Sequence, residues 1–179
     1  MPPHWPADRD SPGRWSERPR DGDNSVAWLV WHMARWHDIA VNVLVRDVDP
    51  VLDDAWQRAI DVGVAPGTGF TSEEVDEFSQ RVDPTALDKY WAAVLDRTTD
   101  WLTSIDDQEL DDLMTRVIDT DSRYRDSKVS LLVPASEWVR DWHRGHPGAW
   151  HLRWVVVGHT YWHFGEMQSV CTALGHPNM

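Results

Sequence analysis

His159 and His163 stand four residues apart in the segment GHTYWHFGE, and this pair is the feature of the sequence best suited to chemistry. If the segment is helical, both imidazoles project from one face and can bind the same metal ion. The spacing equally fits two histidines that hydrogen-bond within a polar patch, and on spacing alone we favour that simpler interpretation.

Two further observations favour a metal site. Both histidines lie on an apolar stripe, where a buried imidazole needs a partner on each nitrogen. A third histidine, His32, lies beside the apolar stripe of a different predicted helix. We therefore predict that His32, His159 and His163 converge, with ligating nitrogens about 3–3.5 Å apart. Imidazole ligands suit zinc, nickel, copper and iron alike, so the sequence does not identify the divalent metal.

Glu166 follows His163 by three residues and stays on the same predicted helix face. It could orient a histidine ligand, act as a fourth ligand or serve as a general base. It fits equally well as a solvated glutamate at the edge of the stripe. Asp38 is predicted to cap its helix or to pair locally with Arg35. Cys171 lies among apolar neighbours and is predicted to be a packed thiol rather than a nucleophile.

Four other histidines are predicted to lie on the surface or in loops, away from the site. They are His37, His143, His146 and His151.

Two long helices are predicted to carry the three histidines. The first begins at Asn24 or Ser25, which are good N-cap residues, and continues to about residue 46. The last helix covers about residues 149–174, with Gly175 at its C-terminal end and Pro177 to stop it.

The segments between these helices are predicted from helix-breaking residues and helix-capping residues. Glycine and proline indicate a long connection, Thr71 or Ser72 caps a short acidic helix, and Asp83 caps a longer one. The ranges are a connection at 47–70, helices at 72–80 and 84–105, an acidic irregular region at 106–134 with a weak extended signal, and a short helix at 135–142.

Composition excludes several classes of function. The formal net charge is −13 and the chain has only two lysines, so we expect no binding to nucleic acid or to an anionic membrane surface. A single cysteine rules out an internal disulfide, and no apolar run is long enough to span a bilayer. We expect a cytoplasmic protein with one domain over residues 24–179, preceded by a flexible arm at 1–23.

The two histidine segments also carry a resemblance to a known family. DGDNSVAWLVWHMARWHDIAVN and GHTYWHFGEMQSVCTALG resemble the two metal motifs of the DinB-like helical-bundle superfamily. That superfamily is similar to bacterial thiol-dependent S-transferases, which include mycothiol-dependent maleylpyruvate isomerase. The family pattern places a histidine after W-x-x-x on one helix and H-x-x-x-H-x-G-Q/E on a later one. Here those positions are His32, His159 and His163, followed by Gly165 and Glu166.

The resemblance implies an all-α fold, namely a four-helix bundle of up-down-down-up type with long loops. It implies three histidine ligands near one end of the bundle and an open coordination position, as in catalytic sites. The sequence departs from the family before Glu17, where a short proline-rich segment replaces a full helix. We therefore expect a shortened first helix, and a homodimer is one way to complete such a bundle.

Two functions are compatible with these observations. In the first, the protein is a metal-dependent S-transferase or isomerase that activates a low-molecular-weight thiol such as mycothiol toward an electrophile. In the second, it is a non-enzymatic, stress-responsive metal-binding protein. A pocket above the metal with some polar or basic lining would favour the enzyme, whereas a fourth protein ligand would favour a structural site.

Overall fold

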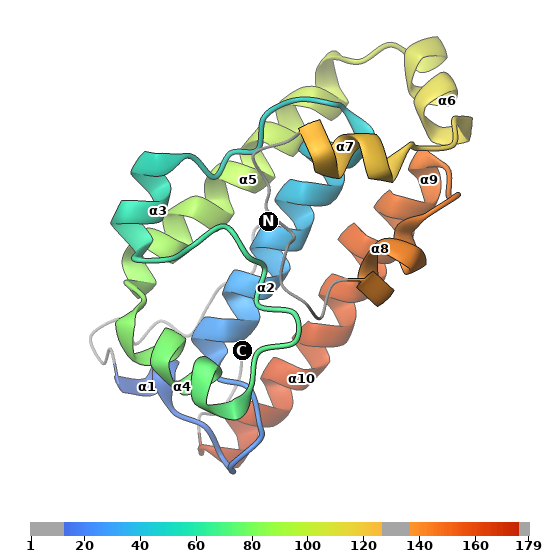
Figure 1. The fold of residues 1–179 in the computed structure, drawn as a ribbon. Coiled ribbons are helices and arrows are strands. Elements are labelled where there is room, and N and C mark those ends of the chain that lie inside the picture. Colours follow the sequence, from blue (N-terminus) through green and yellow to red (C-terminus); the bar gives the residue numbers. More distant parts are fainter. Residues whose placement is uncertain (1–12, 127–136, 176–179) are drawn as a thin grey trace.

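The computed structural model describes residues 13–126 and 137–175, and in these residues the protein is helical without a strand (Figure 1). The α-helices are α1 Gly13–Ser16, α2 Val26–Asp38, α3 Asp54–Ile60, α4 Ser72–Arg81, α5 Pro84–Ser104, α6 Asp107–Thr115, α7 Thr120–Asp126, α8 Glu137–His143, α9 Gly148–Trp150 and α10 His159–Ala173. Two π-helical segments, η1 Ile39–Val45 and η3 His151–Gly158, continue α2 and lead into α10.

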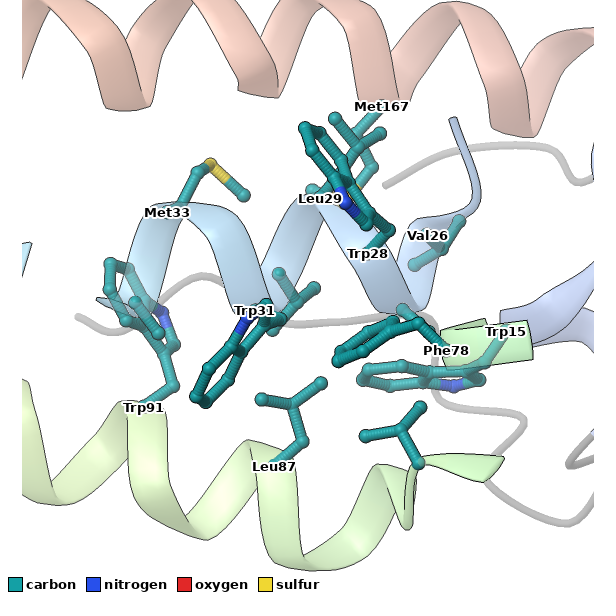
Figure 2. Close-up of a cluster of buried hydrophobic side chains, with 14 of the residues drawn as sticks. Trp15, Val26, Trp28, Leu29, Trp31, Met33, Phe78, Leu87, Trp91 and Met167 are labelled. Atoms are coloured by element: carbon teal, nitrogen blue, oxygen red, sulfur yellow. The ribbon is translucent and has the colours of Figure 1, made fainter. Parts of the chain in front are cut away.

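Three long helical segments form the body of the molecule: α2 with η1, α5, and α9 with η3 and α10. In Figure 2, α2 lies between α5 and α10. The all-α bundle that the sequence predicts is confirmed. Within the described residues, the chain before α2 contributes only the four residues of α1.

The ends of these helices follow the predicted capping signals. The Ser25 hydroxyl accepts a hydrogen bond from the backbone N–H of Trp28, and Asp83 caps α5 through the N–H of Ala86. Thr71 begins α4 with a capping box. Gly175 adopts a φ of 75° just beyond α10, as the C-terminal glycine signal predicts. Pro177 lies outside the described residues.

Two regions predicted to be irregular contain helices. The connection at 47–70 includes α3, which Asp53 caps by accepting from the backbone N–H groups of Ala55 and Trp56. The acidic region at 106–134 contains α6 and α7, and Asp106 caps α6. An aspartate N-cap and acidic residues in the first turn offset the low apolar content of these short helices. Residues 127–136, where much of the weak extended signal lies, are outside the described residues.

Residues 13–23, which the sequence assigned to a flexible arm, pack against the bundle. Trp15 of α1 is buried in the main core, and the Arg18 guanidinium lies 2.6 Å from the Asp76 carboxylate of α4. Arg18 also donates hydrogen bonds to the backbone carbonyl and the hydroxyl of Ser72. A tryptophan and an arginine thus attach this segment, and residues 1–12 lie outside the described part of the chain.

Tryptophan supplies much of the aromatic packing of the core, as the 13 tryptophans against three tyrosines and three phenylalanines predict. Trp31 of α2 lies near Phe78 in Figure 2, with ring centroids 6.0 Å apart. The ring of Trp31 also lies 5.8 Å from that of Tyr90. Met167 of α10 and Leu87 of α5 complete opposite sides of the same cluster. This packing fixes α2 between the two helices that flank it.

All 13 residues of α2 are buried, including its polar ones. Buried charges persist in proteins when they are paired and hydrogen-bonded. The Arg35 guanidinium accordingly lies 3.2 Å from the Asp38 carboxylate, so the predicted local pairing of Asp38 is confirmed. No face of α2 is exposed, and its four buried titratable side chains all contact polar groups elsewhere in the protein: His32, Arg35, His37 and Asp38.

Among the described residues, no helix combines the length and the apolar character needed to cross a lipid bilayer.

Candidate metal centre

The three predicted histidines meet at one point between α2 and α10. The Nε2 atom of His159 lies 3.1 Å from the Nε2 of His32 and 3.1 Å from the Nε2 of His163. One nitrogen from each histidine falls within 4.8 Å of the other two, so the group could hold a metal ion. The predicted convergence is confirmed, and metal occupancy stays a prediction.

Helix α10 begins at His159 and brings His163 beneath it one turn later. The π-helical segment η3 leads directly into His159, and wide turns of this kind recur beside functional sites in helical proteins. His32 reaches the same point from the middle of α2, and 127 residues of chain separate it from His159. Packing of α2 against α10 therefore assembles the group.

The ring of His32 is held on its far side. Its Nδ1 donates a hydrogen bond of 2.7 Å to the backbone carbonyl of Pro66, since a carbonyl can only accept. The indole of Trp28 stacks on the imidazole with ring centroids 4.4 Å apart and an angle of 14° between planes. These two contacts direct the Nε2 of His32 toward His159.

Pro66 belongs to a short stretch of the 47–70 connection that runs along α2. Side chains of α2 donate hydrogen bonds to this stretch at each step: Trp31 to the carbonyl of Ala65, Arg35 to the carbonyl of Val64, and Trp36 to the hydroxyl of Thr68. Gly67 has a φ of 82°, and a Cβ there would lie 2.7 Å from the Trp28 indole nitrogen. This stretch, which sequence reasoning treated only as a loop, positions the acceptor for His32.

Glu166 holds His163 in the same way. The Nδ1 of His163 lies 2.7 Å from one carboxylate oxygen of Glu166, and the amide of Asn24 donates to the other oxygen at 2.7 Å. Burial raises the pKa of Glu166, but the hydrogen bonds from His163 and Asn24 outweigh it and leave the pKa below its usual value. Glu166 is therefore a carboxylate that accepts from His163, which favours the orienting role among those left open by the sequence.

The resulting protonation pattern suits a cation. His32 and His163 each use Nδ1 as the donor, so a neutral ring presents a lone pair at Nε2. The Nδ1 of His159 is buried without a partner among the described residues. The hydrogen-bonding contacts of the His159 ring are therefore those of its Nε2 atom. One Nε2 proton cannot satisfy two facing lone pairs at 3.1 Å, whereas a metal ion would satisfy all three nitrogens.

Burial and electrostatic repulsion keep His32 and His159 in the neutral form that binds metals. Burial, and then repulsion from His159 and His163, lowers the pKa of His32 well below its usual value. Burial and His163 likewise lower the pKa of His159 to about 3, although Glu166 acts in the opposite direction. Metal ligation needs neutral imidazole, so both groups are ready to bind a cation at neutral pH.

Glu166→Gln is expected to lower a metal-dependent rate while leaving metal content nearly intact. The glutamine oxygen can still accept from His163 Nδ1, but the negative charge that makes His163 a stronger donor to the metal is lost. Losses at such positions are typically about 10–100-fold in activity or affinity. Elemental analysis and steady-state assays on the same preparation check this, and a variant that is metal-free as purified would contradict it.

A cavity of about 430 Å³ lies beside the three histidines. Its walls come from α2, α8, η3 and α10, together with Thr68 of the 47–70 connection. A volume of this size accommodates a small organic ligand. The room above the metal position that would favour an enzyme is thus present, and its described lining includes polar side chains, namely Thr68 and four histidines, but no charged one.

His143 also lines this cavity, and sequence reasoning placed it wrongly on the surface. His143 and His151 are buried, and their Nδ1 atoms lie 3.3 Å apart. Trp36 stacks on His143 with ring centroids 5.2 Å apart. His37 is buried as well, with Nε2 3.0 Å from the hydroxyl of Thr98. Single isolated histidines give no sequence signal of burial, because only the fold brings their aromatic neighbours together.

These buried histidines predict sensitivity to acid. Burial, and then repulsion from neighbouring histidines, lowers the pKa of His143 to about 3 and that of His151 to about 4. Burial lowers the pKa of His37 to about 4 against the opposing effect of Asp38. Between pH 4 and 6.5 the unfolded chain therefore binds more protons than the folded chain, so stability falls as pH decreases through this window.

His37→Gln is expected to reduce that slope. Each such histidine contributes about 1.4 kcal/mol per pH unit, and glutamine can keep a hydrogen bond to Thr98 without titrating. Urea unfolding of chelator-treated protein at several pH values from 5 to 6.5 measures the slope. Equal slopes for the variant and the wild type would show that His37 is not held neutral.

The fold and the histidine geometry together define a helical-bundle protein with a three-histidine group that could hold a metal ion. The sequence profile of the DinB superfamily matches residues 7–167, and the chain belongs to this superfamily. The crystal structure of a conserved protein from Enterococcus faecalis has a similar fold, with a TM-score of 0.63 and 20% sequence identity over 92% of this chain and 84% of that chain. That similarity concerns the fold alone. No curated protein sequence matches the chain.

Proposed function

We propose that this is a cytoplasmic, divalent-metal-dependent S-transferase or isomerase that activates a low-molecular-weight thiol such as mycothiol. The observation that carries the proposal is the cavity of about 430 Å³ whose wall includes His32, His159 and His163. A site with three protein ligands and room beside them has the pattern of catalytic metal centres rather than of closed structural ones. Membership of the DinB superfamily is compatible with metal binding.

The chain's own residues have separable tasks in this proposal. The three histidines would hold the ion, and the ion would lower the pKa of a bound thiol so that the thiolate forms near neutral pH. Pro66 and Glu166 orient two of the ligand rings through their Nδ1 atoms. The indoles around the cavity would pack against the second substrate, and a bound substrate would cover their exposed rings.

Cys171 is not assigned a role in the reaction. Its side chain is buried in the main core, and burial raises the pKa of the thiol, so the reactive thiolate is disfavoured. The predicted packed thiol is confirmed. Cys171→Ala therefore serves as the control that separates a metal–thiol mechanism from a cysteine nucleophile.

The test is elemental analysis of protein purified without an affinity tag, followed by thiol titration with maleylpyruvate-like and epoxide-like electrophiles. We expect about one divalent ion per chain and thiol consumption that stops on chelation and returns with metal. Activity that survives complete chelation, or that disappears in folded Cys171→Ala, would contradict the proposal.

The lack of charged side chains among the described residues of the cavity wall is the observation that favours the second candidate, a non-enzymatic metal-binding protein. Bound metal without reaction toward any thiol would support that alternative. A homodimer stays a prediction, and light scattering of metal-free and metal-loaded protein tests it.

A further inference from the structure

The cavity beside the metal position is walled by indole rings. Its apolar lining consists of Trp36, Trp138, Trp142, Val139, Val155 and Trp162. The other described lining residues are histidines and Thr68, and among the residues that the structure describes none of the lining is a carboxylate, an ammonium or a guanidinium. The chemistry of this wall therefore differs from that of a site built to bind a charged molecule.

Three of the four indoles remain open to solvent. Trp138, Trp142 and Trp162 are 61%, 45% and 78% exposed, respectively. Large apolar side chains that gather in the open around a cavity mark ligand-binding surfaces in folded proteins. A ligand in the cavity would cover these rings, and flat ring systems pack well against indole in offset or edge-to-face arrangements.

Several polar atoms of the wall already face other groups of the protein. The Thr68 hydroxyl oxygen accepts from the Trp36 indole at 3.0 Å, and the Nδ1 of His143 faces that of His151. The Nε2 atoms of the three site histidines face one another. A carboxylate that entered the metal-free cavity beside the indoles would lose its hydration without gaining a charged partner from the described residues of the wall.

The charge of a bound metal ion would also disfavour a cationic ligand in the cavity. Indole faces attract ammonium groups, but an ion held by the three histidines would repel a second cation in the same cavity. The net charge of −13 further disfavours the approach of anions. An uncharged molecule escapes both penalties, and the volume of about 430 Å³ fits a ligand of one or two fused rings.

We propose that the electrophile bound at this site is an uncharged planar molecule, aromatic or conjugated, held between the indoles of α8 and α10. As a statement about a substrate it rests on the proposed thiol-transfer function. As a statement about binding it rests only on the cavity. If the three histidines held an ion and the thiol sulfur bound to it, the indole-lined space would remain for the second molecule.

The experiment compares two probes that share one ring system and differ in charge, methyl 2-naphthoate and 2-naphthoate. Their dissociation constants are measured by ligand-observed NMR with zinc-loaded protein and again after chelation. We expect the ester to bind at least about tenfold more tightly than the carboxylate in the metal-free state, where no ion attracts the carboxylate. Equal or tighter binding of the carboxylate to the metal-free protein would overturn the inference.

Tryptophan variants locate the binding. Trp162→Ala and Trp138→Ala should each weaken ester binding by about tenfold, because each removes a stacking ring. Trp154→Ala is the matched control, since Trp154 is 58% exposed on η3 and does not line the cavity. All three positions are exposed, so folding should persist, and circular dichroism verifies it. Unchanged ester binding in both cavity variants would overturn the inference.

The two proposals can fail separately. Selective ester binding without thiol consumption would reject the thiol-transfer function and keep the cavity as a site for uncharged planar ligands. Metal-dependent thiol consumption with anionic electrophiles alone would keep the function and reject the substrate class.

Discussion

His163→Ala is expected to abolish most of the thermal stabilisation that zinc gives to the wild-type protein. An ion that binds only the folded state adds about 2.7 kcal/mol at a free concentration one hundred times its Kd. For a chain of this size that corresponds to roughly 5–10 °C in Tm. The variant lacks one of three converging nitrogens, so zinc should shift its Tm far less. Thermal unfolding with zinc and with a chelator measures both shifts.

His146→Ala is the matched control for this experiment. His146 stacks on Trp150 with ring centroids 4.0 Å apart and does not belong to the three-histidine group. Its loss should leave the zinc-dependent shift intact, even if the baseline Tm changes. If chelation costs wild-type protein and His163→Ala the same stability, the group is not a metal site.

The convergence of the histidines was predictable because helical periodicity is local. Four-residue spacing places His159 and His163 on one face whatever the surroundings, and apolar neighbours indicate that this face is buried. His32 was harder to assign, since only its position beside an apolar stripe pointed to the site. Packing of α2 against α10 then brings it within 3.1 Å of His159.

The support behind His32 was not predictable. Its partner is the backbone carbonyl of Pro66, and a carbonyl has no signature in the sequence because every residue has one. Glycine and proline in GVAPGTGFT correctly indicated a break in helix, yet they said nothing about where the segment runs. Glu166 differs, because its spacing from His163 made the contact an open alternative from the start.

The short helices were missed for a different reason. Helices α6 and α7 have acidic sequences, and the expected irregularity followed from the weakness of their apolar pattern. Asp106 followed by Asp107 and Glu109 is a capping signal that would have identified α6. Capping residues are therefore better indicators than hydrophobic periodicity where a helix buries little surface.

The polar end of α2 holds the fold together through Asp38. Its carboxylate is fully buried and accepts five hydrogen bonds. The donors are the side chains of Arg35, Asn42 and Tyr90 and the backbone N–H groups of Val51 and Leu52. One side chain thus ties together α2, η1, α5 and the start of the 47–70 connection.

Asp38→Ala is expected to cost about 3–5 kcal/mol, because it leaves the guanidinium of Arg35 buried without its counter-ion. That is a large share of the roughly 5–15 kcal/mol by which domains of this kind are stable. Urea unfolding measures the loss. Asp141→Ala is the control, since Asp141 pairs with Arg144 in an exposed position and its removal should change little.

A double variant identifies the cause of that loss. If the unpaired charge of Arg35 dominates, Arg35→Leu combined with Asp38→Ala should be less destabilised than the sum of the two single variants, since neither charge is then left buried alone. Additive losses would instead assign the effect to the backbone N–H groups of Val51 and Leu52, which lose their acceptor in either background. A loss below about 1 kcal/mol for Asp38→Ala would contradict the buried network itself.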